Sequence, residues 1–160
     1  LIIAGGVPDE PKHRAFFDQA VRPRLDGDRI QHIGPVNDAQ KNQLLGQAAA
    51  FLMPTLWDEP FGIVMAEALA CGTPVVGLHR GSVPEVVSNG LNGFVCSTVD
   101  SMVDAVGMIA TIDRRNCRRV MDEKFSDEAI VGAYESLYMS ACSADAAPSG
   151  AAARAQARPR

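Results

Sequence analysis

The sequence has few of the residue patterns that mark several large classes of protein. Its four cysteines, Cys71, Cys96, Cys117 and Cys142, form no CxxC pair and have no histidine-rich segment beside them. Zinc sites and redox dithiols need such spacings, so we expect no metal site, and reduced thiols in a cytoplasmic protein. No apolar run approaches the roughly 20 residues that span a bilayer, and no signal peptide is expected.

Basic residues are also fewer than acidic ones. The chain carries 15 lysines and arginines against 19 aspartates and glutamates, a formal net charge of -4. Proteins that bind nucleic acid normally carry a basic stripe, so nucleic acid is not an expected partner. The arginines at 114–119 and near the end of the chain could contact an anionic membrane surface; a solvated helix face and a linker are the alternative interpretation.

Short apolar runs alternate with helical patterns along most of the chain. Strands are predicted over residues 1–6, 29–36, 49–54, 73–78 and 92–96. Helices are predicted over residues 10–22, 38–48, 61–72, 83–90, 99–110, 113–123 and 126–140. This alternation is typical of βαβ units and predicts an α/β fold with a Rossmann-like, doubly wound parallel sheet.

The two ends of the chain differ from the rest. Residues 143–160 contain no bulky apolar side chain, which predicts a disordered Ala/Arg/Pro tail because such a segment has nothing to bury. Residues 1–142 are therefore expected to form one domain. The chain begins with Leu1 inside an apolar run, so we expect this domain to be cut from a longer protein.

Glu67 is the one fully charged side chain between Gly62 and Leu78. The predicted helix around it is apolar on every side, as in a helix packed within a domain. An unpaired carboxylate in such a helix costs several kcal/mol, so Glu67 must have a hydrogen-bonding partner or face a cleft. It either bridges to an arginine on a neighbouring helix or accepts hydrogen bonds from hydroxyls such as those of a ribose.

The loop before this helix follows a strand, at the edge of the sheet where doubly wound folds bind ligands. The backbone N–H groups of Phe61, Gly62 and Ile63 at the helix start could therefore bind a phosphate. Glu59 is either an acceptor for sugar hydroxyls or a favourable acid beside the helix start.

Four more residues lie close to this edge in the predicted fold. His79 and Arg80 follow the strand at 73–78, and Arg80 is placed to approach a phosphate. Glu85 either faces the cleft or stabilises the start of its own helix. Trp57 is expected to pack beside the site.

The stretch EPFGIVMAEALACGTPVV belongs to a longer series of motifs that includes AGG, GPV, GSVPEVV and a final helix beginning FS. In this order they resemble the family 4 retaining glycosyltransferases, over Leu1 to about Tyr138. The resemblance implies the C-terminal half of a GT-B fold, which is the domain that binds the donor nucleotide sugar.

The resemblance also implies a role for each candidate residue. Glu59 is the catalytic-site residue that contacts hydroxyls of the donor sugar, and Glu67 binds the ribose. The implied donor site as a whole consists of Glu59, Phe61, Gly62, Ile63 and Glu67, with Gly34 and Val36 near the base. The donor is a UDP, GDP or ADP sugar, and the acceptor is a glycan or a small molecule. No cofactor and no obligatory metal are implied, because positive charge and a helix dipole stabilise the leaving diphosphate.

Two parts of the family pattern have no counterpart in this sequence. These are the acceptor domain and a loop whose Arg and Lys neutralise the diphosphate, so this chain alone is expected to be inactive. A catalytically inactive module that binds or senses sugar nucleotides is the alternative, and a GT-B-like epimerase is a more distant one. If residues 1–6 are the second strand of a 3-2-1-4-5-6 sheet, the central strand is missing and residues 1–6 will not pair with the strand at 49–54.

Overall fold

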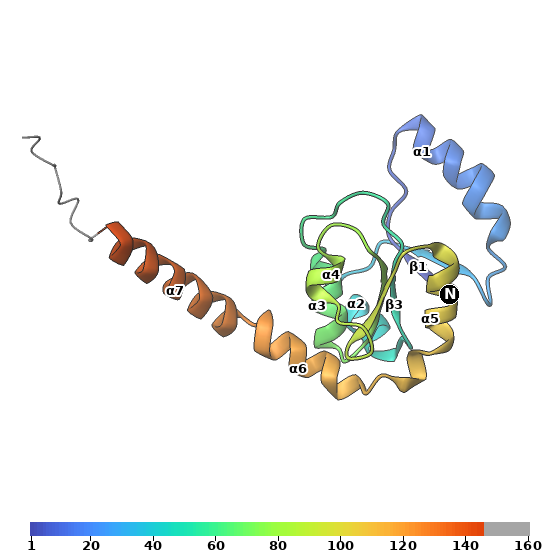
Figure 1. Ribbon diagram of the computed structural model, residues 1–160. Coiled ribbons are helices and arrows are strands. Elements are labelled where there is room, and N and C mark those ends of the chain that lie inside the picture. The colour runs from blue at the N-terminus through green and yellow to red at the C-terminus, as the bar shows by residue number, and fades with distance from the viewer. Residues whose placement is uncertain (146–160) are drawn as a thin grey trace, which may run out of the picture.

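The computed structural model describes residues 1–145, in which strands and helices alternate along the chain (Figure 1). The strands are β1 (Ile2–Ala4), β2 (Gln31–Gly34), β3 (Phe51–Met53), β4 (Val75–Leu78) and β5 (Gly93–Cys96). The helices are α1 (Pro11–Phe16), α2 (Asp38–Gln47), α3 (Ile63–Ala70), α4 (Val83–Val86), α5 (Val99–Gly107), α6 (Arg114–Lys124) and α7 (Asp127–Asp145). Each predicted strand and helix is present, and a π-helical turn continues α1 over Phe17–Val21.

The strands form two parallel sheets instead of one. β1 pairs with β2, and β3, β4 and β5 form the larger sheet in that order, with β4 in the centre. No hydrogen bond joins β1 to β3, and the residues of β1 are all exposed. The parallel strands between helices confirm the α/β prediction. β1 and β3 do not pair with each other, as expected if residues 1–6 correspond to the second strand of a 3-2-1-4-5-6 order.

β4 is buried on both of its faces. Val75 packs with Met65 and other residues of α3 in one apolar cluster. Val76 belongs to a second cluster that contains Met102 and Ala105 of α5. Successive side chains of a strand point to opposite faces, so helices must cover both sides of the larger sheet. The fold therefore leaves the ends of the strands, and not their faces, open to ligands.

A capping box marks the start of α2, and glycines flank α3. Asn37 caps α2: its side chain accepts from the Gln40 N–H at 2.9 Å, and the Gln40 side chain accepts from the Asn37 N–H at 3.0 Å. α3 follows Gly62, whose φ of 70° lies in the left-handed region, and Gly72, which has the same φ, follows its last turn, as is common at the end of a helix.

The arginine cluster of α6 is used within the domain. Arg114 donates to the carbonyl oxygens of Ala48 and Gly46 at 2.6 and 3.1 Å, which fastens α6 to the end of α2. Arg115 and Arg118 form ion pairs with aspartates on or beside the same helix. These contacts agree with the helix-face interpretation of the cluster. Among the helices of residues 1–145, none combines the length and apolar character that a membrane crossing requires.

α7 extends away from the rest of the molecule (Figure 1). It runs to Asp145, so residues 143–145 are helical although the sequence predicted no fixed structure from Ser143 onward. The helix continues through these residues because extending a helix that has already begun costs far less than starting one. The remaining part of the predicted tail, residues 146–160, lies outside the described residues.

Gly93 offers a test of the packing of the larger sheet. A Cβ at this position would overlap the backbone carbonyl oxygen of Val75 on β4, which cannot move aside without breaking the sheet. We expect Gly93→Ala to lower the free energy of unfolding by about 2 kcal/mol or more. The control is Gly46→Ala in α2, where a Cβ meets nothing within 4 Å and should raise it by about 0.5–1 kcal/mol. Urea denaturation measures both, and an equally stable Gly93→Ala protein would contradict the packing described.

Candidate functional site

The carboxyl ends of β3, β4 and β5 meet at one edge of the larger sheet, because the three strands are parallel. The predicted residues Glu59, Phe61 and Gly62 lie in the loop after β3. The loop after β4 carries His79 and Arg80, and the N–H of His79 donates to the carbonyl of Cys96 at 2.8 Å, which joins the ends of β4 and β5.

The loop that contains Glu59 is held by Gly81 and Ser82 of the next loop. The Ser82 N–H donates to the Glu59 carbonyl at 3.0 Å, and the buried Ser82 hydroxyl donates to the Phe61 carbonyl at 2.7 Å. The Gly81 N–H donates to Asp58 Oδ1 at 3.2 Å. Gly81 lies so close to the Glu59 backbone that no Cβ would fit between them. These contacts fix the position of Glu59 before any ligand binds.

The Glu59 carboxylate is half-buried and has an indole partner. Its Oε2 accepts a hydrogen bond from Trp57 Nε1 at 3.0 Å, while Trp57 itself is 66% exposed. Trp57 was predicted to pack beside the site, and it does lie there, but through a hydrogen bond and not through burial. Within residues 1–145 the other carboxylate oxygen of Glu59 has no hydrogen-bond donor, so it is available to a ligand.

The start of α3 presents unused backbone donors. Among the described residues, the N–H groups of Phe61, Gly62 and Ile63 donate to no protein acceptor. They lie at the positive end of the helix dipole, which favours an anion. The Phe61 ring packs edge-on against Phe125, with the ring centroids 5.7 Å apart. The side chain of Phe61 is thus engaged in packing, and its amide is the group left for binding.

Glu67 lies in the second turn of α3 and forms an ion pair with α2. Its Oε1 accepts from Lys41 Nζ at 2.6 Å, and the side chains of Lys41 and Glu67 are 29% and 30% exposed. This confirms that Glu67 has a hydrogen-bonding partner on a neighbouring helix, although the partner is a lysine and not an arginine. Hydrogen bonds to Glu67 and to Asp38 raise the pKa of Lys41 above its usual value. Sequence reasoning missed Lys41, because nothing local to α2 marks it.

Gly34 is the last residue of β2, and Val36 lies in the loop that joins β2 to α2. Gly34 has a φ of 72°, and its carbonyl accepts from the Gly5 N–H at 2.8 Å. Val36 is half-buried and directly precedes Asn37, the cap of α2. Lys41 follows about one turn later. The structure therefore connects Gly34 and Val36 to Glu67 through α2, whereas no hydrogen bond within residues 1–145 joins either of them to Glu59.

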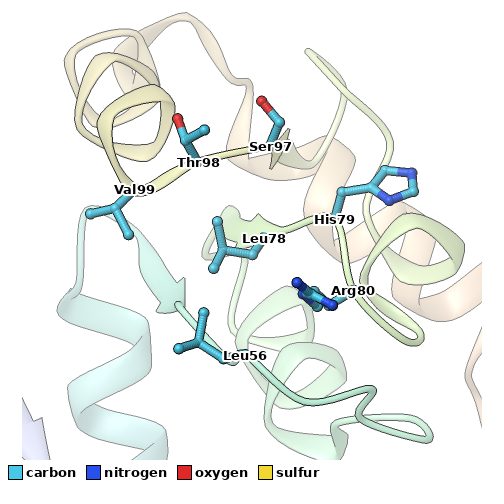
Figure 2. Close-up of a pocket in the computed structure, with 7 residues that line it drawn as sticks. All are labelled: Leu56, Leu78, His79, Arg80, Ser97, Thr98 and Val99. Carbon is cyan, nitrogen blue, oxygen red and sulfur yellow. The ribbon is translucent and has the colours of Figure 1, made fainter.

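A pocket of about 480 Å³ opens beside the Glu59 loop (Figure 2). It is lined by Leu56, Leu78, His79, Arg80, Ser97, Thr98 and Val99. Arg80 points toward Leu56 and Leu78, and His79 turns to the opposite side (Figure 2). Glu59, Gly62 and Glu67 are not part of the lining. The pocket adjoins their loop all the same, since Arg80 immediately precedes the residues that hold Glu59.

Other chemistry-bearing groups are not assembled into a site. Within residues 1–145 no group of three or more His, Cys, Asp or Glu side chains is placed to hold a metal ion. The four cysteines are free thiols. Burial raises the pKa of Cys117 to about 11 and also raises the pKa of Cys96, so both thiols stay protonated near neutral pH and are poor nucleophiles.

A protein-family model described as "Glycosyl transferases group 1" matches residues 1–125. Alpha-maltose-1-phosphate synthase of Mycobacterium tuberculosis is 44% identical over 97 residues, which are 58% of this chain and 24% of the relative. N-acetyl-alpha-D-glucosaminyl L-malate synthase of Bacillus anthracis is 35% identical over 88 residues, 50% of this chain and 23% of the relative. In both cases the chain spans about a quarter of the relative's length.

Solved structures show the same fold. Sucrose-phosphate synthase from Thermosynechococcus elongatus matches with a TM-score of 0.72 and 25% identity, over 90% of this chain and 39% of that structure. HepE from Anabaena in complex with UDP-glucose matches with a TM-score of 0.66 and 23% identity, over 89% of this chain and 40% of that structure. These neighbours are GT-B glycosyltransferases, and the match to the C-terminal domain of larger members confirms the predicted half of that fold.

Replacing Gly81 tests whether the two loops depend on each other. We expect the Cβ of Gly81→Ala to displace the Glu59 loop and to change the emission of Trp57, the only tryptophan in the sequence. The control is Gly90→Ala. Gly90 also has a positive φ, of 75°, but a Cβ there meets nothing within 4 Å. It should cost about 1–2 kcal/mol of stability and leave the emission spectrum unchanged. Identical spectra for the two variants would contradict the proposed dependence.

Proposed function

This chain belongs to the group 1 glycosyl transferases, and we propose that it is the part of such an enzyme that binds the nucleotide-diphosphate sugar donor. The observation that carries the proposal is the edge of the larger sheet, where unused amides at a helix start lie next to a fixed carboxylate. The structures of HepE with UDP-glucose and with UDP share the fold and support a nucleotide sugar as the ligand class.

In the proposed site the diphosphate binds at the start of α3. The N–H groups of Phe61, Gly62 and Ile63 donate to its oxygens, and the helix dipole adds favourable charge. Arg80 faces the adjoining pocket and brings a permanent positive charge to the same edge. This arrangement lets neutral backbone groups and one arginine stabilise the diphosphate as it leaves.

Glu59 is the proposed catalytic-site residue, since its carboxylate contacts the hydroxyls of the donor sugar. Trp57 occupies Oε2 and thereby directs Oε1 toward the ligand. A sugar held at a fixed angle to the diphosphate reacts faster, because the cost of orienting it has already been met on binding. Glu67 accepts hydrogen bonds from the ribose, and the loop with Gly34 and Val36 lies near the base.

The proposed reaction of the whole protein is the transfer of the sugar to a glycan or small-molecule acceptor. The anomeric carbon exchanges its bond to the diphosphate for a bond to the acceptor oxygen on the same face, as in family 4 enzymes, so the configuration is retained. The acceptor proton leaves with the diphosphate. A metal-free mechanism, a cytoplasmic location and a UDP, GDP or ADP donor remain predictions.

Titration calorimetry with UDP, GDP and ADP tests the proposal directly. We expect at least one of them to saturate the protein below about 1 mM, and the corresponding nucleotide sugar to bind as well. Absence of binding by all three would overturn the proposed function. Binding without turnover in the full-length protein would instead favour the inactive binding module, the second hypothesis from the sequence.

The two glutamates should affect binding in different ways. Glu67→Gln keeps the side-chain shape but weakens its charge-assisted hydrogen bonds, so we expect it to cost about 1.5–3 kcal/mol of affinity for both the free nucleotide and the nucleotide sugar. Glu59→Gln should lower the affinity for the nucleotide sugar and leave the affinity for the nucleoside diphosphate nearly unchanged. Calorimetry with both ligands measures the difference, and Glu123→Gln on the exposed face of α6 is the control.

Thermal melting without ligand separates binding from a structural role. If Glu67 served only the fold, Glu67→Gln would melt early and bind normally. That result would end the ribose assignment. A normal melting temperature together with weak binding of both ligands supports it.

A further inference from the structure

Lys41 and Glu67 meet between α2 and α3 at the open edge of the fold. Lys41 lies in the first half of α2, close to the loop that contains Val36, and Glu67 faces it from α3. Both side chains keep roughly a third of their surface exposed to solvent. The pair is therefore within reach of a ligand that approaches the start of α3.

The packing of α2 does not depend on this ion pair. The other half of α2 is held by buried Leu45, whose carbonyl accepts from the Thr73 hydroxyl at 2.5 Å, and by the two hydrogen bonds from Arg114. The capping box fixes its start. Partly exposed ion pairs contribute little to stability, so docking of α2 does not account for a lysine at position 41.

The geometry of the pair suits a hydroxyl ligand. The ammonium of Lys41 has three hydrogens, and the described residues offer it two acceptors, Glu67 Oε1 at 2.6 Å and Asp38 Oδ1 at 3.1 Å. One donor is left over. Glu67 in turn keeps the acceptor sites of Oε2 and a second one on Oε1. A hydroxyl both donates and accepts, so it can satisfy Glu67 and Lys41 together.

We propose that Lys41 is a second residue of ribose recognition, which orients the Glu67 carboxylate and selects ribonucleotides over deoxyribonucleotides. The inference rests on the proposed role of Glu67. Because one oxygen of the carboxylate accepts a hydrogen bond from Lys41, the carboxylate cannot rotate freely. Its remaining acceptor sites therefore point in a fixed direction before the ribose binds. Less ordering is then needed on binding, and the hydrogen bonds to the sugar hydroxyls are stronger.

The test compares ribonucleoside diphosphates with their 2′,3′-dideoxy analogues on the same protein. The ribonucleotide is whichever of UDP, GDP and ADP binds the unsubstituted chain most tightly. We expect Lys41→Met to lower the affinity for the ribonucleotide about five- to tenfold. The affinity for the dideoxy analogue should fall less than twofold, because the analogue lacks the ribose hydroxyls that Lys41 and Glu67 would bind. Lys41→Arg should recover most of the affinity. Asp38→Asn is the matched control, because Asp38 is the other ion-pair partner of Lys41 and its side chain is 94% exposed. It should change the affinity for either nucleotide by no more than twofold.

Each outcome separates the inference from the proposed function. If the unsubstituted protein binds none of the ribonucleotides, both are wrong. If Glu67→Gln shows the hydroxyl-dependent loss and Lys41→Met does not, only the role of Lys41 is wrong. An equal loss for both nucleotides in Lys41→Met would show a purely structural effect and would overturn the inference. Lys41→Gln repeats the comparison if Lys41→Met does not fold.

Discussion

The close contact between Gly81 and the backbone of Glu59 is the constraint on which the functional edge depends. It presses the loop after β3 against the loop after β4, and the hydrogen bonds from Ser82 then fix that loop at two carbonyls. As a result the conformation of this surface loop is set by its contacts with the loop after β4, which include the hydrogen bond from the Gly81 N–H to Asp58. Glu59 and the amides of α3 are free for a ligand for that reason.

α3 joins this constrained loop to the core. Its Met65 and Leu69 are fully buried against the larger sheet, while Glu67 on the same helix keeps contact with solvent. The amides at its start and the Glu67 carboxylate therefore belong to one rigid element. Groups carried on a packed helix are positioned more accurately than groups on separate loops, which suits recognition of several parts of one ligand.

Much of this fold could be predicted from the sequence because its signals are local. The Asn37 cap, the glycine that ends α3 and the alternation of strands with helices all depend on neighbouring residues. Glu67 stood out in the same way, as a lone charge in an apolar helix. The extension of α7 past Cys142 was missed because composition alone marks small residues as unable to pack, whereas a helix already begun needs no packing to continue.

The parts that could not be predicted are contacts between distant segments. Lys41 looks like any exposed helical lysine until the fold brings α2 against α3, and the sequence suggested an arginine, not a lysine, as a partner of Glu67. The bond from Trp57 to Glu59 depends on a loop conformation that Gly81 imposes from another loop. Ser97 and Thr98 also line the pocket; Thr98 is recognisable locally only as the cap of α5, which does not indicate a place in a pocket.

The break between β1 and β3 divides the molecule into parts of unequal resistance to opening. β1 and α1 contain no buried residue, and β1 shares no hydrogen bond with β3, so we expect the first 34 residues to open more readily than the sheet that carries α3. Val36 stands at the border of that weaker part. A nucleotide that contacted both the Val36 loop and Glu67 would link the less stable part to the rest of the domain. Its binding would therefore slow amide hydrogen exchange in segments that it does not contact.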